Sequence, residues 1–131
     1  MSVKVDVSRL AETLRDYGFA YLHVVNPAME QMQSGKAPDP PALGMVETIR
    51  KKFKGTLMVA GGFEADTAAQ WLREGKADLI AFGRKFLANP DLPERFATSA
   101  PLNTPDPTTF YAPGAKGYID YPALNPEPTT A

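Results

Sequence analysis

The first part of the chain alternates between helix-like and strand-like patterns. In residues 7–17 apolar side chains recur every three to four positions, with charged residues on the other faces, which predicts an amphipathic helix ending at Gly18. Residues 19–25 are almost continuously apolar and lie between Gly18 and Asn26-Pro27. A run of this length without polar alternation predicts a buried parallel strand.

The following segment breaks the alternation. Residues 27–43 are polar and contain several prolines, including Pro38, Pro40 and Pro41. Proline removes a backbone donor and opposes regular structure, so we expect a long loop with room for one short helical turn.

The alternation then resumes and predicts an α/β fold. Helical spacing covers residues 45–54 and 65–74, and continuous apolar runs cover residues 56–60 and 79–82. One helical turn fits residues 85–88, and Asn89-Pro90 matches an N-cap followed by a first-turn proline, opening a helix over residues 90–96. Strands that are apolar on both faces and alternate with helices imply a parallel sheet covered by helices.

The end of the chain has a different character. Nine of the 13 prolines fall between Pro90 and Pro128, so we divide the chain into residues 1–96 and a proline-rich tail, residues 97–131. The tail also carries aromatic residues, which a disordered segment would lack, and we expect it to dock on the folded body. Whether these aromatic side chains serve packing or line a ligand site is left open by the sequence. They are Phe110, Tyr111, Tyr118 and Tyr121.

The composition argues against several classes of function. A net charge of −1 offers no basic surplus for nucleic acid, and the lack of cysteine excludes disulfides and thiolate metal sites. No apolar run approaches the roughly 20 residues that would span a bilayer. We therefore expect a cytoplasmic protein with no membrane or nucleic-acid partner. His23 is the single histidine, so a metal site has no support, and we interpret it as a core or barrel-interior residue.

Two of the predicted strands end in glycine, which suggests where a ligand would bind. In parallel α/β folds ligands gather at the carboxyl ends of the strands. Gly61-Gly62 can bring bare backbone amides close to an anion, and Gly83-Arg84 adds a guanidinium that can bind phosphate through two hydrogen bonds. The pair predicts a phosphate site. The simpler interpretation is a tight turn at Gly61-Gly62 and a surface ion pair for Arg84.

At these residues the sequence becomes recognisable. The segments VAGGF (59–63), ADLIAFGR (77–84), ANPDL (88–92), FY (110–111) and GYIDYP (117–122) occur in order over nearly the whole chain. Together they resemble the carboxyl-terminal part of the Old Yellow Enzyme family of FMN-dependent ene-reductases. The resemblance implies a partial (β/α)8 TIM barrel in which the chain supplies strands six, seven and eight.

The resemblance also implies a cofactor site. FMN would be the bound cofactor and NAD(P)H the reductant. Tyr111 matches a tyrosine that lines the substrate pocket, where an activated alkene would be reduced. The residues implied at the FMN are Ala60, Gly61, Gly62, Phe82, Gly83, Arg84 and Phe110.

The chain departs from the family in its length. A complete barrel needs about 250 residues, and the family's carbonyl-activating pair and proton-donating tyrosine match no position here. We expect the chain to be inactive alone and to need the missing amino-terminal barrel segment or a partner chain. Exposed sheet edges would favour self-association. The alternatives are a phosphate- or FMN-binding module without catalysis, and a truncated gene product that pairs with another chain.

Overall fold

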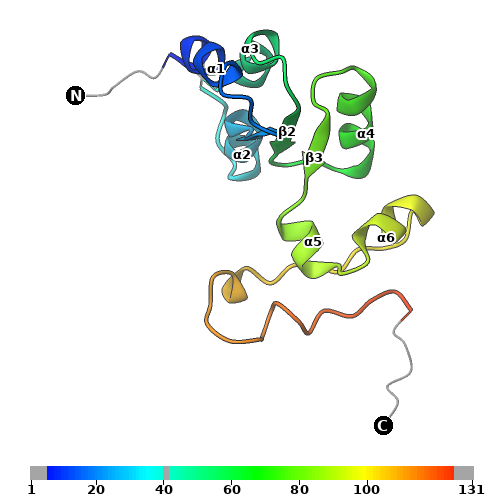
Figure 1. Cartoon of the computed structure of the whole chain (residues 1–131). Coiled ribbons are helices and arrows are strands. Elements are labelled where there is room, and N and C mark those ends of the chain that lie inside the picture. Colours follow the sequence, from blue (N-terminus) through cyan, green and yellow to red (C-terminus); the bar gives the residue numbers. More distant parts are fainter. Residues whose placement is uncertain (1–5, 40–41, 126–131) are drawn as a thin grey trace. The chain divides into compact units, whose positions relative to one another are not determined.

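The computed structural model describes residues 6–39 and 42–125, and it divides after Ala81 into two compact units (Figure 1). The predicted boundary at residue 96 separates the barrel units from the tail, whereas the division after Ala81 separates compact units. The boundary at residue 96 therefore stays a prediction. Among the described residues no helix is long and apolar enough to cross a bilayer.

The first unit is built on a parallel sheet of three strands in the order β1-β2-β3 (Figure 1). The register aligns Val24 with Val59 and Val59 with Ile80. This arrangement confirms the predicted α/β class. The strands are β1 (Leu22–Val25), β2 (Leu57–Ala60) and β3 (Leu79–Ala81), and the helices are α1 (Val7–Arg15), α2 (Pro27–Gln33), α3 (Met45–Lys52) and α4 (Ala65–Arg73).

The two faces of the sheet differ in burial. On one face Leu57 and Val59 have no exposed surface, and they form the core together with buried residues of the helices, such as Ile49 of α3. On the other face Val25 is 52% exposed and Leu79 is 44% exposed. We call this second face the open face; its members are His23, Val25, Met58, Ala60, Leu79 and Ala81.

His23 lies on the open face and is exposed. The core interpretation of this residue is therefore wrong for the chain as it stands. The alternation of a strand explains the result, because His23 points opposite to its buried neighbour Val24. The barrel-interior interpretation stays a prediction.

Helix α2 corrects the expected long loop. It runs over seven residues, more than the single turn allowed for residues 27–43. Asn26 is the N-cap, and its side-chain oxygen accepts a hydrogen bond from the Ala28 amide at 3.2 Å. Pro27 takes the first helical position, where the missing amide costs nothing. The proline thus starts a helix rather than preventing one. Pro40 and Pro41 lie outside the described residues.

A carboxylate joins α3 to the sheet. Arg50 of α3 donates to both oxygens of Asp78, at 2.6 and 3.1 Å, and the Leu57 amide of β2 donates to the same carboxylate at 2.8 Å. The Arg50 hydrogen bond, followed by that of the Leu57 amide, holds the pKa of Asp78 below its ordinary value.

We expect Asp78→Asn to destabilise the chain by about 1 kcal/mol at neutral pH, a value reduced for the partial exposure of the pair. Because the folded pKa is lowered, the stabilisation is present above the ordinary aspartate value of 3.8 and is lost as the pH falls through the folded value. Urea unfolding at neutral pH and near pH 3 measures both effects. Asp16→Asn, in an exposed ion pair with Arg15, is the control and should change little. An equal loss in both variants would contradict the expectation.

The second unit contains two short helices, α5 (Arg84–Ala88) and α6 (Leu92–Thr98), and a 3-10 turn, Pro107–Thr109. The predicted N-cap at Asn89 is wrong. Asn89 ends α5, and its side-chain oxygen accepts a hydrogen bond from the Asn103 amide at 2.7 Å. Asp91 takes the N-cap position of α6, with Pro93 in the first turn. A partner 14 residues away thus outweighs the local capping signal.

Candidate functional site

Strand β2 ends in the predicted glycine turn. Ala60 pairs with Ala81 of β3, and Gly61 and Gly62 follow with φ of +112° and +69°. A Cβ on Gly61 would lie 3.3 Å from the Asn26 carbonyl oxygen, and one on Gly62 would lie 3.2 Å from the Cβ of Met29. Backbone conformation and close packing therefore both favour glycine here. The tight-turn interpretation is sufficient for these residues in the first unit.

The Gly83-Arg84 turn at the start of the second unit is different. No protein atom lies within 4 Å of the position where a Cβ of Gly83 would be, so packing does not require this glycine. Arg84 is exposed, and within the described ranges it pairs with no carboxylate. Phe82, directly before the turn, packs edge-to-face on Phe96 with ring centroids 5.2 Å apart. An exposed guanidinium beside an open glycine is suited to an anion such as phosphate.

Arg84 and Phe110, both predicted at the cofactor, are brought together by the structure. The guanidinium carbon of Arg84 lies 6.0 Å from the centroid of the Phe110 ring. This distance is at the limit for a cation–π interaction. Two residues that are 26 positions apart in the sequence thus lie close together in the second unit.

Tyr111 presents its side chain fully to solvent. It is 99% exposed and has φ of +58°, a left-handed conformation that is costly for a residue with a bulky side chain. Strained residues of this kind cluster at functional sites, because the surrounding structure must hold them in place. The conformation and exposure are compatible with the predicted role in a substrate pocket.

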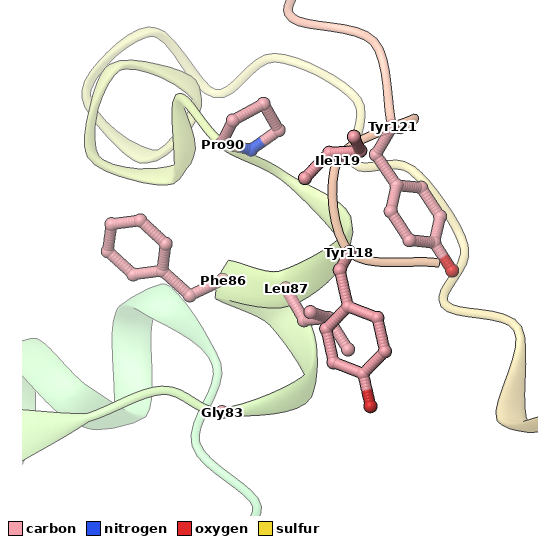
Figure 2. Close-up of a pocket in the computed structure, with 7 residues that line it drawn as sticks. All are labelled: Gly83, Phe86, Leu87, Pro90, Tyr118, Ile119 and Tyr121. Atoms are coloured by element: carbon pink, nitrogen blue, oxygen red, sulfur yellow. The ribbon is translucent and has the colours of Figure 1, made fainter. Parts of the chain in front are cut away.

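A hollow of about 440 Å³ adjoins Gly83 in the second unit (Figure 2). Its walls come from α5, the following turn and the tail, and they are mainly apolar and aromatic. Sequence reasoning did not assign Phe86 or Leu87 to a site, although the aromatic density of the tail indicated Tyr118 and Tyr121 as lining or packing residues. The lining residues are Gly83, Phe86, Leu87, Pro90, Tyr118, Ile119 and Tyr121.

The described residues contain no candidate metal site. In the part of the chain that the structure describes, no three His, Asp or Glu side chains are grouped as they would be around an ion.

Comparison with known proteins decides the family. Residues 3–103 match the model of the NADH:flavin oxidoreductase / NADH oxidase family. The chain belongs to this family. It is 41% identical over 116 residues to 12-oxophytodienoate reductase 2 of Arabidopsis thaliana, covering 88% of the chain and 30% of that relative. The resemblance to Old Yellow Enzymes is thereby confirmed, as are FMN and NAD(P)H as the cofactors of the family.

Solved structures of the family extend the match to the fold. Morphinone reductase is 45% identical, with a TM-score of 0.77, covering 90% of the chain and 30% of that protein. The old yellow enzyme from Trypanosoma cruzi is 36% identical, with a TM-score of 0.76, covering 91% of the chain and 29% of that protein. The chain thus spans about 30% of the length of these family members, which confirms the predicted partial barrel.

Proposed function

We propose that the chain is the cofactor-anchoring part of an FMN-dependent ene-reductase, completed by an amino-terminal barrel segment. The observation that carries this proposal is the exposed Arg84 guanidinium beside the open Gly83 and the ring of Phe110. Membership of the flavin oxidoreductase family supports the FMN phosphate as this anion.

Each site residue has a distinct task in this proposal. Arg84 and the amide of Gly83 bind the phosphate. Ala60, Gly61 and Gly62 are assigned to the cofactor by the family resemblance. Phe82 and Phe110 lie beside the cofactor, and Tyr111 lines the substrate pocket. The FMN that these residues would hold would supply the redox chemistry, the transfer of hydride from NAD(P)H to an activated alkene. The protein supplies binding and orientation.

The need for a second segment follows from the length and from the open face. The chain spans about 30% of its relatives, and the side of the sheet opposite the helices carries exposed apolar residues such as Val25 and Leu79. Such a face favours association with further barrel strands. A cytoplasmic location stays a prediction, made from the lack of a bilayer-spanning apolar run and consistent with the lack of cysteine.

Arg84→Ala tests the phosphate site directly. In the barrel completed by an amino-terminal segment, we expect the Kd for FMN to rise roughly 10- to 150-fold, the loss of one or two charge-assisted hydrogen bonds. Quenching of flavin fluorescence measures the binding. Riboflavin, which lacks the phosphate, should bind both proteins equally, and Arg73→Ala, an exposed arginine at the end of α4, serves as the charge control.

Two results would count against this assignment. If FMN affinity is unchanged in Arg84→Ala, the guanidinium does not hold the phosphate. If riboflavin affinity falls as much as FMN affinity, the substitution damages the fold rather than the phosphate contact. Tight FMN binding by a completed barrel without any alkene reduction would favour a binding module instead.

A further inference from the structure

A buried arginine on α6 holds two segments of the tail. Arg95 is 4% exposed, and its Nε donates to the Asp91 carboxylate at 2.7 Å. Its Nη1 donates to the Pro101 carbonyl at 2.7 Å, and its Nη2 donates to the Pro122 carbonyl at 2.9 Å. One guanidinium therefore ties two segments, 21 positions apart in the sequence, to the same helix.

Asp91 and Leu124 reinforce this anchor. The Leu124 amide donates to the second oxygen of the Asp91 carboxylate at 2.6 Å. This hydrogen bond, together with that of Arg95, holds the pKa of Asp91 below its ordinary value. The carboxylate thus stays charged at neutral pH and compensates the buried guanidinium.

A pair of asparagines forms a second anchor. Asn89 is fully buried and accepts from the Asn103 amide at 2.7 Å, while the Asn103 side chain donates to the carbonyls of Ala88 and Pro122, both at 2.8 Å. The Pro122 carbonyl therefore receives hydrogen bonds from both anchors. We call the segment that they close, residues 103–121, the tail loop.

Within the tail loop Gly117 packs closely against Thr109, the residue before Phe110. A Cβ on Gly117 would lie 2.2 Å from the Oγ1 of Thr109, so any larger residue must displace Thr109. The Tyr121 hydroxyl accepts from the Asp106 amide at 2.8 Å and joins the two sides of the tail loop. The position of Phe110 and Tyr111 thus depends on the closed loop.

We propose that Arg95 is a positioning residue for the FMN and substrate site, because it closes the tail loop that carries Phe110 and Tyr111. This inference rests on the proposed function, which gives these two residues their tasks. In this proposal Arg95 acts through the tail loop rather than by contact with a ligand.

If Arg95 only stabilised α6, it would not need its hydrogen bonds to the tail. The Arg95–Asp91 pair is an i,i+4 pair within α6 and needs no contact with the tail. Two further hydrogen bonds of the guanidinium go to tail carbonyls. Lysine keeps the charge and can keep the Asp91 pair, but its single ammonium cannot reproduce the planar set of donors. Arg95→Lys therefore separates tail closure from helix stabilisation.

The first test uses the chain alone and hydrogen exchange read by mass spectrometry. In Arg95→Lys and in Gly117→Ala we expect amides of the tail loop to exchange roughly tenfold faster, the loss of about one charge-assisted hydrogen bond, with the sheet unchanged. Gly114→Ala is the matched control for Gly117→Ala. Gly114 also has positive φ, at +96°, but a Cβ there meets nothing within 4 Å. Unchanged exchange in Arg95→Lys would overturn the proposal.

The second test uses the barrel completed by an amino-terminal segment. Both variants should raise the KM for 2-cyclohexen-1-one roughly tenfold, whereas the control Gly114→Ala should leave it unchanged. A loosened tail loop with an unchanged KM would overturn the proposal. If Arg95→Lys unfolds α5 and α6 as well, Gly117→Ala decides, because it acts within the tail loop. If the completed wild type fails to reduce the alkene, the proposed function fails, while exchange in the chain alone still decides whether Arg95 closes the loop.

Discussion

The purified chain alone is expected to leave 2-cyclohexen-1-one unreduced, and turnover is expected to appear once the amino-terminal two thirds of an Old Yellow Enzyme barrel is supplied. The described residues form three strands where a closed barrel has eight, and open-face residues such as Val25 and Leu79 are exposed. The resemblance places the carbonyl-activating pair and the proton-donating tyrosine in the absent part. Positioning of these groups is the main contribution of the protein to such a reaction.

This experiment needs the chain, the amino-terminal barrel segment and two controls. The chain is co-expressed with the corresponding segment of morphinone reductase, and the saturated ketone is measured by gas chromatography after anaerobic incubation with FMN and NADPH. The morphinone reductase segment without the chain, and the mixture with Arg84→Ala, should both produce far less ketone. Reduction by the chain alone would overturn the proposal that catalysis needs the missing segment.

Leu57→Ala is expected to destabilise the chain by about 3 kcal/mol, within the range measured for leucine truncations in protein cores. Leu57 has no exposed surface and lies on the sheet face that the helices cover. Small domains have a total stability of only about 5–15 kcal/mol, so this one substitution removes a large share. Leu79→Ala, the same change on the open face of the neighbouring strand, should cost less than about 1 kcal/mol because Leu79 is 44% exposed.

Urea unfolding followed by circular dichroism measures both variants. In the completed barrel the cost of Leu79→Ala should rise by roughly 1–2 kcal/mol, because the side chain then becomes buried. The cost of Leu57→Ala should stay the same, since its surroundings lie within the chain. Equal costs for the two variants in the chain alone would contradict the assignment of the two faces.

The three strands could be predicted because each is a continuous apolar run next to glycine or Asn-Pro. The full length of α2 could not be predicted, since the polar composition of residues 27–43 and the prolines Pro38, Pro40 and Pro41 argue against regular structure. A proline preceded by asparagine is also a helix start, and the sequence contained that signal at Asn26-Pro27. The opposite error occurred at Asn89-Pro90, where the same pair of residues does not start a helix.

Asn26 and Asn89 differ in whether their hydrogen-bond partners are close in the sequence. Asn26 caps the residues that directly follow it, so its role can be predicted from the adjacent sequence. Asn89 bonds to Asn103, and this pairing depends on the return of the tail. Arg95 is similar, because on its helix it resembles a surface charge, and only the carbonyls of Pro101 and Pro122 bury it. Contacts between distant segments carry no signal in a single sequence.

The candidate site was predicted more fully than the tail. The glycine turns and Arg84 stand at strand ends, where a rule about parallel sheets identifies ligand positions. The left-handed backbone of Tyr111 had no such signal, because no glycine or asparagine marks it. Its role was indicated by the family resemblance alone.

The order of the sheet bears on how the chain is made. Each strand pairs with the strand that precedes or follows it in the sequence, so β2 can dock on β1, and β3 on β2, as each leaves the ribosome. Contacts of this kind have short sequence separation, which is associated with fast folding. In a closed barrel β1 would pair with the strand directly before it in the sequence, and only the pairing of β3, as the eighth strand, with the first strand would be a long-range event. The slow step of barrel assembly would therefore lie at the β3 edge of this sheet.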